Sequence, residues 1–338
     1  MQLKPVDQQV VVVFGASSGI GRETALRFAK RGAKVVVSAR SEAGLASLVE
    51  QIRLEGGEAT AVPADAIDFE QVRAVADRAV AEYGRLDTWV HAAAVSIFSP
   101  FEQITPAEFK QVIDVNLTGQ AYGAMAALPH LKREGRGALI HISSVEARRS
   151  IPLQSPYSAS KHGVEGFLDA LRLELMHAGV PISVTNVMPG VINTPFYNKA
   201  RTRLGVKPMS IPPFYDPGLV ADAILYVAEH PKRDITVGDV GKLVNFLQFL
   251  SPQLMDSLLL AVGFPLQRTN EPKSDDGPDA LFEPMTGYDR AEGDFKSLTV
   301  PSVTDWFDRH PAAAAVAGVA LSAVALLTVR ALTSADRD

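Results

Sequence analysis

The sequence predicts an α/β fold: a doubly wound parallel sheet of about seven strands, forming a single catalytic domain followed by a C-terminal tail. Short apolar runs rich in β-branched residues alternate with amphipathic helical stretches, which is typical of parallel strands joined by helices on both faces of a sheet. A glycine-rich turn follows the first apolar run directly, as it does in dinucleotide-binding folds. We find no internal repeat of 20 to 50 residues.

The pattern predicts strands near residues 10–14, 34–38, 58–62, 86–91, 137–143, 181–187 and 234–237. Four residues with distinctive chemistry follow a predicted strand directly: Gly15, Asp65, Ser144 and Pro189. Ligands of such sheets bind beyond the carboxyl ends of the strands. We therefore expect these four residues to border one cleft.

The glycine-rich turn reads Gly15-Ala16-Ser17-Ser18-Gly19-Ile20-Gly21 and opens a helix with an apolar face. Unpaired backbone amides and the helix dipole at such a helix start attract an anion. Three glycines alone are weak evidence, and an ordinary turn is the alternative. The strand before them and the helix after them favour a nucleotide phosphate site.

Tyr157 and Lys161 stand four residues apart, so on a helix they share one face. A tyrosine titrates near pH ~10, and a neighbouring cation lowers that pKa, which suits general acid or base catalysis. Taken alone, this spacing more often reflects aromatic packing beside a surface lysine. Ser144, thirteen residues upstream, and the glycine-rich turn favour a proton-transfer site.

These motifs together resemble the short-chain dehydrogenase/reductase family over about residues 6–240, in the family's order. The resemblance implies a catalytic group of Asn116, Ser144, Tyr157 and Lys161. With the glycine-rich turn, it implies cofactor contacts at Gly15, Ser17, Ser18, Gly19, Ile20, Gly21, Arg40, Asp65, Ala92, Ala93, Asn116, Tyr157, Lys161, Pro189, Gly190, Ile192 and Thr194.

Two segments depart from the family pattern. Phe14 replaces the usual threonine before the first glycine, and His91-Ala92-Ala93-Ala94 replaces an Asn-Asn-Ala-Gly segment. We expect His91 to be a structural substitute for the asparagine rather than a catalytic residue. The chain has no cysteine and its seven histidines show no ligand spacing, so no metal site is expected.

The end of the second strand predicts NADP(H) as the cofactor. NAD-dependent enzymes of this type place an acidic residue there, whereas an arginine accommodates a 2′-phosphate. Here Ala39 takes the acidic position and Arg40 follows. The alternative is that Arg40 is a solvated charge at a strand end, and Ser18 does not supply the second positive charge found in some NADP-using relatives.

We divide the chain into a catalytic domain (1–242), an apolar helical extension (243–264), an acidic Pro-rich linker (265–310) and a C-terminal transmembrane helix (311–332). The extension breaks at Ser251-Pro252, which predicts a bent helical pair. We favour its packing as a lid or oligomer contact; an apolar collar at the substrate mouth or a shallow membrane insertion is the alternative.

The linker holds 10 acidic and 5 basic residues, which leaves 28 of each sign elsewhere. A neutral catalytic domain without a basic stripe argues against nucleic acid as a partner. Residues 312–329 are uncharged and would span roughly 27 Å as a helix. We expect them to cross a membrane, with the enzyme in the cytoplasm; an Ala-rich helix docked on protein is the alternative.

The sequence thus predicts an NADP(H)-dependent oxidoreductase that interconverts an alcohol and a carbonyl on a lipophilic small molecule. We expect a membrane-tethered homo-oligomer. Epimerase or dehydratase chemistry on the same scaffold, or a non-enzymatic NADP-binding membrane protein, are the alternatives. Every proposed catalytic residue precedes residue 200, so the sequence predicts that a chain cut after residue 264 keeps its activity.

Overall fold

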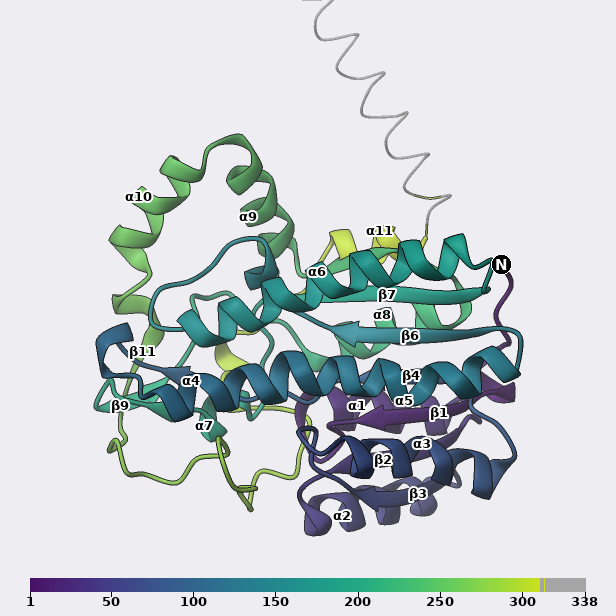
Figure 1. The fold of residues 1–338 in the computed structure, drawn as a ribbon. Helices are drawn as coiled ribbons and strands as arrows, with labels where there is room; N and C mark the ends of the chain where they lie inside the picture. Colours follow the sequence, from purple (N-terminus) through teal and green to yellow (C-terminus); the bar gives the residue numbers. More distant parts are fainter. Residues whose placement is uncertain (311–312, 314–338) are drawn as a thin grey trace, which may run out of the picture. The chain divides into compact units, whose positions relative to one another are not determined.

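The computed structural model describes residues 1–310 and 313. Seven parallel strands form one sheet in the order β10-β7-β6-β4-β1-β2-β3. They are β1 (Val10–Phe14), β2 (Lys34–Ala39), β3 (Glu58–Pro63), β4 (Thr88–His91), β6 (Gly137–Ile142), β7 (Ile182–Pro189) and β10 (Asp234–Val237). The doubly wound sheet predicted from the apolar runs is confirmed (Figure 1).

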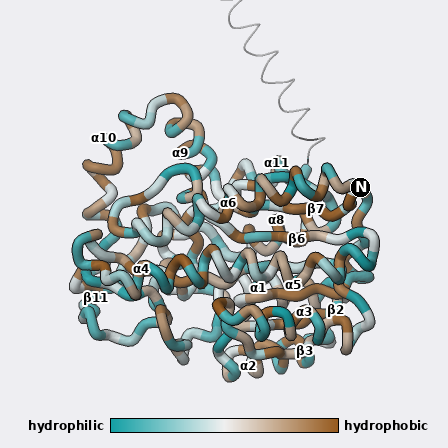
Figure 2. The backbone as a smooth tube through the Cα atoms, viewed as in Figure 1, coloured by the Kyte–Doolittle hydropathy of each residue, from teal (hydrophilic) through white to brown (hydrophobic). Residues whose placement is uncertain are grey.

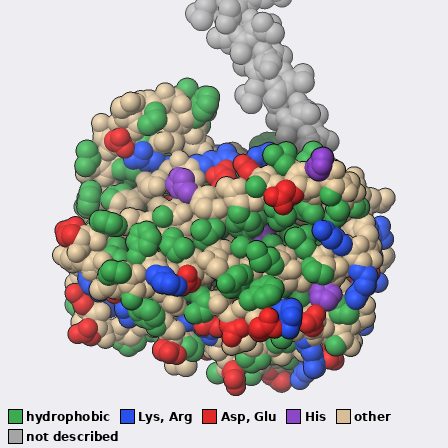
Figure 3. Space-filling view, viewed as in Figure 1, with side chains coloured by type: hydrophobic (Ala, Val, Ile, Leu, Met, Phe, Trp, Pro, Cys, Tyr) green, Lys and Arg blue, Asp and Glu red, His purple; other side chains and the backbone are tan. Residues whose placement is uncertain are grey.

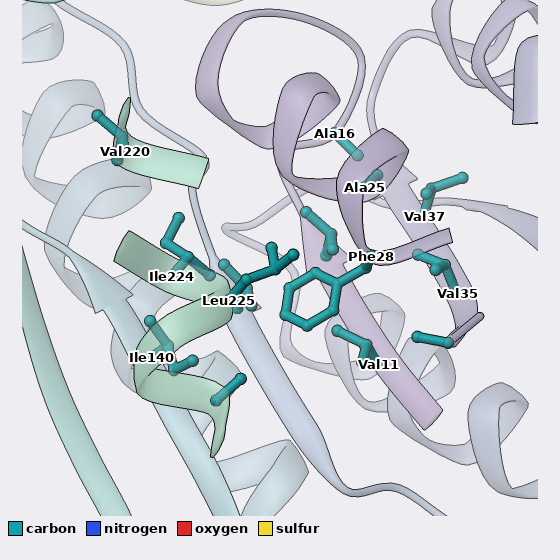
Figure 4. Close-up of a cluster of buried hydrophobic side chains, with 14 of the residues drawn as sticks. Val11, Ala16, Ala25, Phe28, Val35, Val37, Ile140, Val220, Ile224 and Leu225 are labelled. Carbon is teal, nitrogen blue, oxygen red and sulfur yellow. The ribbon is translucent and has the colours of Figure 1, made fainter. Parts of the chain in front are cut away.

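Helices cover both faces of the sheet because successive side chains of a strand point to opposite sides. On one face, Val11 and Val13 pack with α1 (Gly19–Lys30), α2 (Glu42–Leu54) and α8 (Pro217–Glu229). Figure 4 shows Phe28 of α1 lying among strand residues and Leu225 of α8 in this layer.

On the other face, Val10, Val12 and Phe14 pack with α3 (Phe69–Tyr83), α5 (Gly119–Arg133) and α6 (Ser155–His177). All five side chains of β1 are buried, which explains why this strand is apolar throughout (Figure 2).

Shorter elements gather near the carboxyl ends of the strands. They are α4 (Pro106–Ile113), α7 (Phe196–Lys199), and strands β5 (Ile97–Phe98), β8 (Arg201–Thr202), β9 (Val206–Pro208) and β11 (Arg268–Pro272). The pairs β5–β8 and β9–β11 form two small separate sheets. These elements surround the carboxyl edge, where the sequence places the ligand cleft.

A helical hairpin follows the last strand: α9 (Asp239–Leu250) and α10 (Pro252–Val262), meeting at Ser251. It projects from the body of the protein, and most of its apolar side chains are exposed (Figure 1). Phe249 is 85% and Leu260 72% exposed, whereas Met255 and Leu259 are buried. Within one chain, most of the apolar surface of the hairpin is therefore uncovered, and its packing as an oligomer contact stays a prediction.

Residues 265–301 belong to the same compact unit as the sheet, although their composition predicts an extended linker. Leu281 is 1% and Phe295 7% exposed, and the Phe295 ring stacks on Phe214 at 4.5 Å between centroids. A few apolar side chains spaced far apart anchor the segment, and the acidic residues between them conceal that pattern in the composition.

The second unit begins at Ser302 and contains α11 (Thr304–Arg309). The predicted transmembrane helix lies outside the described residues, apart from residue 313. No helix in the part of the chain that the structure describes combines the length and apolarity needed to cross a bilayer.

Candidate active site

One cleft at the carboxyl edge of the sheet brings together most of the residues that the sequence singles out. Those that line it are Gly15, Ser17, Ser18, Gly19, Ile20, Gly21, Arg40, Asp65, Ala92, Ala93, Ser144, Tyr157, Lys161, Pro189, Gly190 and Ile192. Asn116 and Thr194 do not line it, but Asn116 bonds to Val95 and Thr194 lies next to Gly19, and both of those residues line the cleft.

The glycine-rich turn is closely packed. Gly15 has φ +91°, and a β-carbon there would come within 2.4 Å of the Ala93 nitrogen. A β-carbon at Gly21 would stand 2.1 Å from the Gly15 carbonyl oxygen. Both positions therefore require glycine, and the start of α1 can approach a bound ligand with its backbone amides.

Ser144 directs its hydroxyl toward the start of α6, just beyond the end of β6. Its Oγ accepts a hydrogen bond from the Glu146 backbone N–H at 3.1 Å and also hydrogen-bonds to Tyr157. Lys161 follows one turn later: its Nζ lies 5.4 Å from the centre of the Tyr157 ring and donates to the Ile142 carbonyl at 2.9 Å. The predicted proton-transfer residues therefore lie together on one wall of the cleft.

The protonation of this group differs from the prediction. Burial raises the pKa of Tyr157, the charge of Glu146 raises it further, and only the Ser144 hydrogen bond opposes them. Lys161 does not lower it, since burial lowers the pKa of Lys161 itself to about 7, partly offset by Glu146. Tyr157 therefore holds its proton near neutral pH, as a general acid requires.

Glu146 is a buried carboxyl group beside this site that sequence reasoning missed. Its Oε2 accepts a hydrogen bond from Ser158 Oγ at 2.7 Å, and the residue lines the cleft. Burial raises the pKa of Glu146 to about 8, although Ser158 and Lys161 oppose the shift. The carboxyl is therefore largely neutral at pH 7, and no local sequence pattern shows that burial.

A prediction on stability follows from Glu146. Its folded-state pKa of about 8 lies above its ordinary value of 4.5, so the stability that the protonated group contributes is complete below pH 4.5. That contribution is lost as pH rises toward 8, because the unfolded chain releases the proton and the folded chain retains it.

Glu146→Gln keeps the shape and cannot ionise, so it should become steadily more stable than wild type from pH 5 to pH 8. The upper limit is about 1.4 kcal/mol per pH unit. Urea unfolding at pH 5, 6.5 and 8 measures the difference. Glu50→Gln, at an exposed position of α2, is the control. A difference independent of pH would contradict a neutral Glu146.

Asn116 lies in a π-helical turn, Asp114–Thr118, between α4 and α5. Its Oδ1 accepts from the Val95 N–H at 2.8 Å, while Nδ2 donates to the Val95 carbonyl at 2.9 Å and to Ser160 Oγ at 3.3 Å. None of these bonds reaches Lys161. Asn116 therefore fixes the segment after β4 against α6, while its role in a proton relay stays a prediction.

His91 is fully buried in β4, stacked on Phe14 at 5.0 Å between ring centres and on His141 at 6.2 Å. Burial, with the charges of His141 and Lys161, lowers the pKa of His91 well below its usual range. Both departures from the family pattern, Phe14 and His91, thus pack against each other. A fully buried ring stacked on neighbouring rings is typical of a histidine with a structural role.

Arg40 is not a solvated charge at a strand end. Its guanidinium donates to the carbonyl oxygens of Ala280 at 2.6 Å and Phe282 at 2.7 Å, both in the segment after β11. The segment reaches the cleft there, and Ala280, Pro284 and Met285 line it.

Lys199 of α7 is a second cation in the cleft that the sequence did not reveal. Its Nζ donates to Ser18 Oγ at 2.9 Å. Lys199 therefore places a positive charge beside Ser18, the position where some NADP-using relatives have a basic residue. Burial lowers the pKa of Lys199, with Asp289 opposing and Arg40 reinforcing the shift. The two cations, Arg40 and Lys199, therefore act on the same end of the cleft. The bond between Lys199 and Ser18 joins residues 181 positions apart in the sequence.

The comparisons with known proteins agree with this geometry. The family model described as short chain dehydrogenase matches residues 9–205. An uncharacterized oxidoreductase, YxnA of Bacillus subtilis, is 38% identical over 293 residues, covering 86% of this chain and 82% of its own. A match of that length extends beyond α10. 3beta-hydroxysteroid dehydrogenase 1 of Eggerthella lenta is 39% identical over 189 residues, covering 55% and 72%.

Among solved structures, a variant of actinorhodin polyketide ketoreductase with NADPH superposes with a TM-score of 0.60 at 28% identity, covering 70% of this chain and 97% of its own. An alcohol dehydrogenase from Thermococcus sibiricus with 5-hydroxy-NADP has the same fold, with a TM-score of 0.59 at 24% identity, covering 68% and 95%. With the family model matching more than half of its length, the chain is an oxidoreductase that belongs to the short-chain dehydrogenase/reductase family.

Proposed function

We propose that this protein is an NADP(H)-dependent oxidoreductase that reduces a carbonyl to an alcohol on a lipophilic small molecule. The observation that carries the proposal is the single cleft shared by the glycine-rich turn, Ser144, Tyr157 and Lys161. A nicotinamide cofactor bound there would exchange hydride with the substrate carbon. The residues of the chain then have to supply one proton and stabilise the charge that develops on the substrate oxygen.

Tyr157 donates its proton to the substrate oxygen, since its raised pKa keeps the phenol protonated. Ser144 donates a hydrogen bond to the same oxygen and stabilises the charge that develops there. Lys161, with a pKa of about 7, is suited to return a proton toward Tyr157. A catalysed hydride transfer from NADPH to a ketone, followed by absorbance of the reduced nicotinamide, tests this function directly.

The two cations at the adenosine end support NADP(H) over NAD(H). Arg40 follows β2, where an arginine accommodates a 2′-phosphate, and Lys199 adds a second charge beside Ser18. A planar guanidinium with a nearby ammonium suits a dianionic phosphate. The ketoreductase and alcohol dehydrogenase structures named above also contain NADP-type ligands.

Arg40→Ala should weaken NADPH binding by about 1.5–3 kcal/mol, the scale of a charge-assisted hydrogen bond, while NADH binding changes little. Fluorescence titration with each cofactor measures both dissociation constants. Arg53→Ala, an exposed arginine of α2, is the matched control. Equal weakening of both cofactors would show that Arg40 supports the cleft through its bonds to Ala280 and Phe282 rather than reading the phosphate.

A lipophilic substrate fits the other end of the cleft, where Val145, Ile151, Val191 and Phe196 line the space beside Tyr157. The Eggerthella relative is named for a hydroxysteroid, which supports a sterol-like alcohol or ketone as a first compound to test. Glu146 and Gln154 also line this region, so we expect the substrate to carry a polar group close to the reacting carbon.

We also propose that the protein is held at a membrane and forms homo-oligomers. The uncharged residues 312–329 support membrane attachment, and so does the exposed apolar surface of α9 and α10. For the oligomer, Figure 3 shows hydrophobic side chains gathered over α5 and α6, where Met125, Leu173 and Met176 are more than half exposed.

The membrane proposal predicts that the full chain binds to neutral lipid vesicles and stays bound in high salt. Attachment without a charged face is hydrophobic and does not respond to screening. Vesicle flotation of the full chain beside a chain ending at residue 301 measures the effect. Recovery of the full chain in the lipid-free fraction at low salt would contradict the proposal.

A further inference from the structure

We propose that residues 279–295, which we call the strap, cover the phosphate half of the cofactor site and must open for the cofactor to bind. The inference rests on the proposed nicotinamide cofactor and extends it to a segment outside the matched family region, residues 9–205. In Figure 1, the yellow-green chain after β11 passes beneath α7 toward β2 and α2.

The strap contacts the groups that we expect to hold the phosphates. The Gly19 backbone N–H, at the start of α1, donates to the Arg290 carbonyl at 2.9 Å. The Arg40 guanidinium donates to the Ala280 and Phe282 carbonyls. Strap oxygens thus occupy donors that normally face anions in such sites.

Asp289 adds a negative charge at the same place. Its Oδ1 lies 2.5 Å from the position of a β-carbon built on Gly44, in the first turn of α2, and it is buried without a hydrogen-bond partner among the described residues. Asp289 also acts electrostatically on Lys199 and on Arg22 of α1. The strap therefore brings a carboxylate to the cationic end of the cleft, where the cofactor phosphates also have to bind.

Both ends of the strap are anchored, so it can act as one piece. At one end, Asp279 pairs with Arg201 at 2.7 Å and Leu281 is buried. At the other, the Phe295 N–H donates to Asn193 Oδ1 at 2.9 Å and its ring stacks on Phe214.

Between these anchors, most residues from 282 to 292 are exposed. Firm ends with a weakly packed middle are what a covering segment needs if its middle opens while its ends stay attached.

A reversible lock tests the inference. The chain contains no cysteine, so Gly44→Cys with Asp289→Cys introduces the only two thiols. A β-carbon at Gly44 would lie 2.5 Å from Asp289 Oδ1, so two cysteines at these positions would be neighbours, as a disulfide with β-carbons about 3.5–4.5 Å apart requires. Stopped-flow fluorescence of bound NADPH then measures cofactor association and release in the oxidised and reduced forms of one protein.

We expect the disulfide to slow NADPH association at least about tenfold, because it holds the strap oxygens on the donors that the phosphates need, and a reducing agent to restore the rate. The control is Gly44→Ser with Asp289→Ser, treated with the same oxidant. Equal rates in the oxidised and reduced forms would overturn the proposal. Absence of NADPH and NADH binding to the wild-type protein would instead refute the proposed function, so the two failures are distinguishable.

A second measurement uses the unaltered protein, since a side chain at Gly44 also approaches Ser17. The Gly293 N–H, beside the exposed middle of the strap, donates to the Asn193 carbonyl, whereas the Phe295 N–H belongs to the anchored end. Hydrogen exchange of the Gly293 amide should speed up at least about tenfold when NADPH is bound, because the cofactor phosphates take the donors that the docked strap occupies, while exchange of the Phe295 amide should stay unchanged. Gly293 exchange that NADPH leaves unchanged would overturn the proposal whatever the cysteine variant shows.

Discussion

Tyr157→Phe should lower turnover at least about 10²-fold, the low end for removal of a general acid, while cofactor affinity stays nearly unchanged. The change removes only the hydroxyl, which hydrogen-bonds to Ser144, and keeps the ring that packs on Phe196 at 5.5 Å between centroids. Steady-state turnover with a ketone and NADPH, together with a separate titration of NADPH binding, measures both quantities.

Tyr122→Phe is the matched control, because it removes a phenol hydroxyl on α5 away from the cleft while keeping a ring that packs on Phe69. Its turnover should equal that of wild type. If Tyr157→Phe retained turnover within a few-fold of wild type, Tyr157 would not be the proton donor. A loss of NADPH binding equal to the loss of turnover would point to a damaged cleft instead.

A chain cut after residue 264 should be severely destabilised, whereas a chain ending at residue 301 should remain folded. The sequence predicted that a chain cut after residue 264 keeps its activity. The structure changes that expectation, because the cut removes β11, which pairs with β9. It also removes Leu281 and Phe295 from the core. Each buried side chain of this size contributes about 1.5–3 kcal/mol.

Together these losses are comparable to the whole stability of an ordinary domain, about 5–15 kcal/mol. For a chain of this size, we expect a melting temperature at least about 6 °C lower, or no folding at all. Thermal unfolding of the two truncated chains, followed by circular dichroism, is the measurement. Equal melting temperatures would show that residues 265–301 add nothing to the domain, and would also weaken the strap proposal.

The sequence by itself determined the sheet and the place of the cleft. The apolar run of residues 10–14 predicts a strand. The glycines from Gly15 to Gly21, which no other residue could replace, predict the turn that follows it. These are local signals, since each depends on residues within one turn or one strand. Because parallel strands share a carboxyl edge, the local signals also predicted that Gly15 and Ser144 would border the same cleft.

Only the tertiary structure decided what surrounds those residues. Lys199 meets Ser18, and Arg40 meets Ala280, across 181 and 240 positions of the chain. The proton held by Glu146 likewise depends on burial that its neighbours in sequence do not specify. Desolvation and long-range contacts are properties of the assembled core, so neither periodicity nor composition predicts them. For the same reason, the acidic segment that the sequence predicts to be a linker forms a wall of the cofactor cleft in the structure.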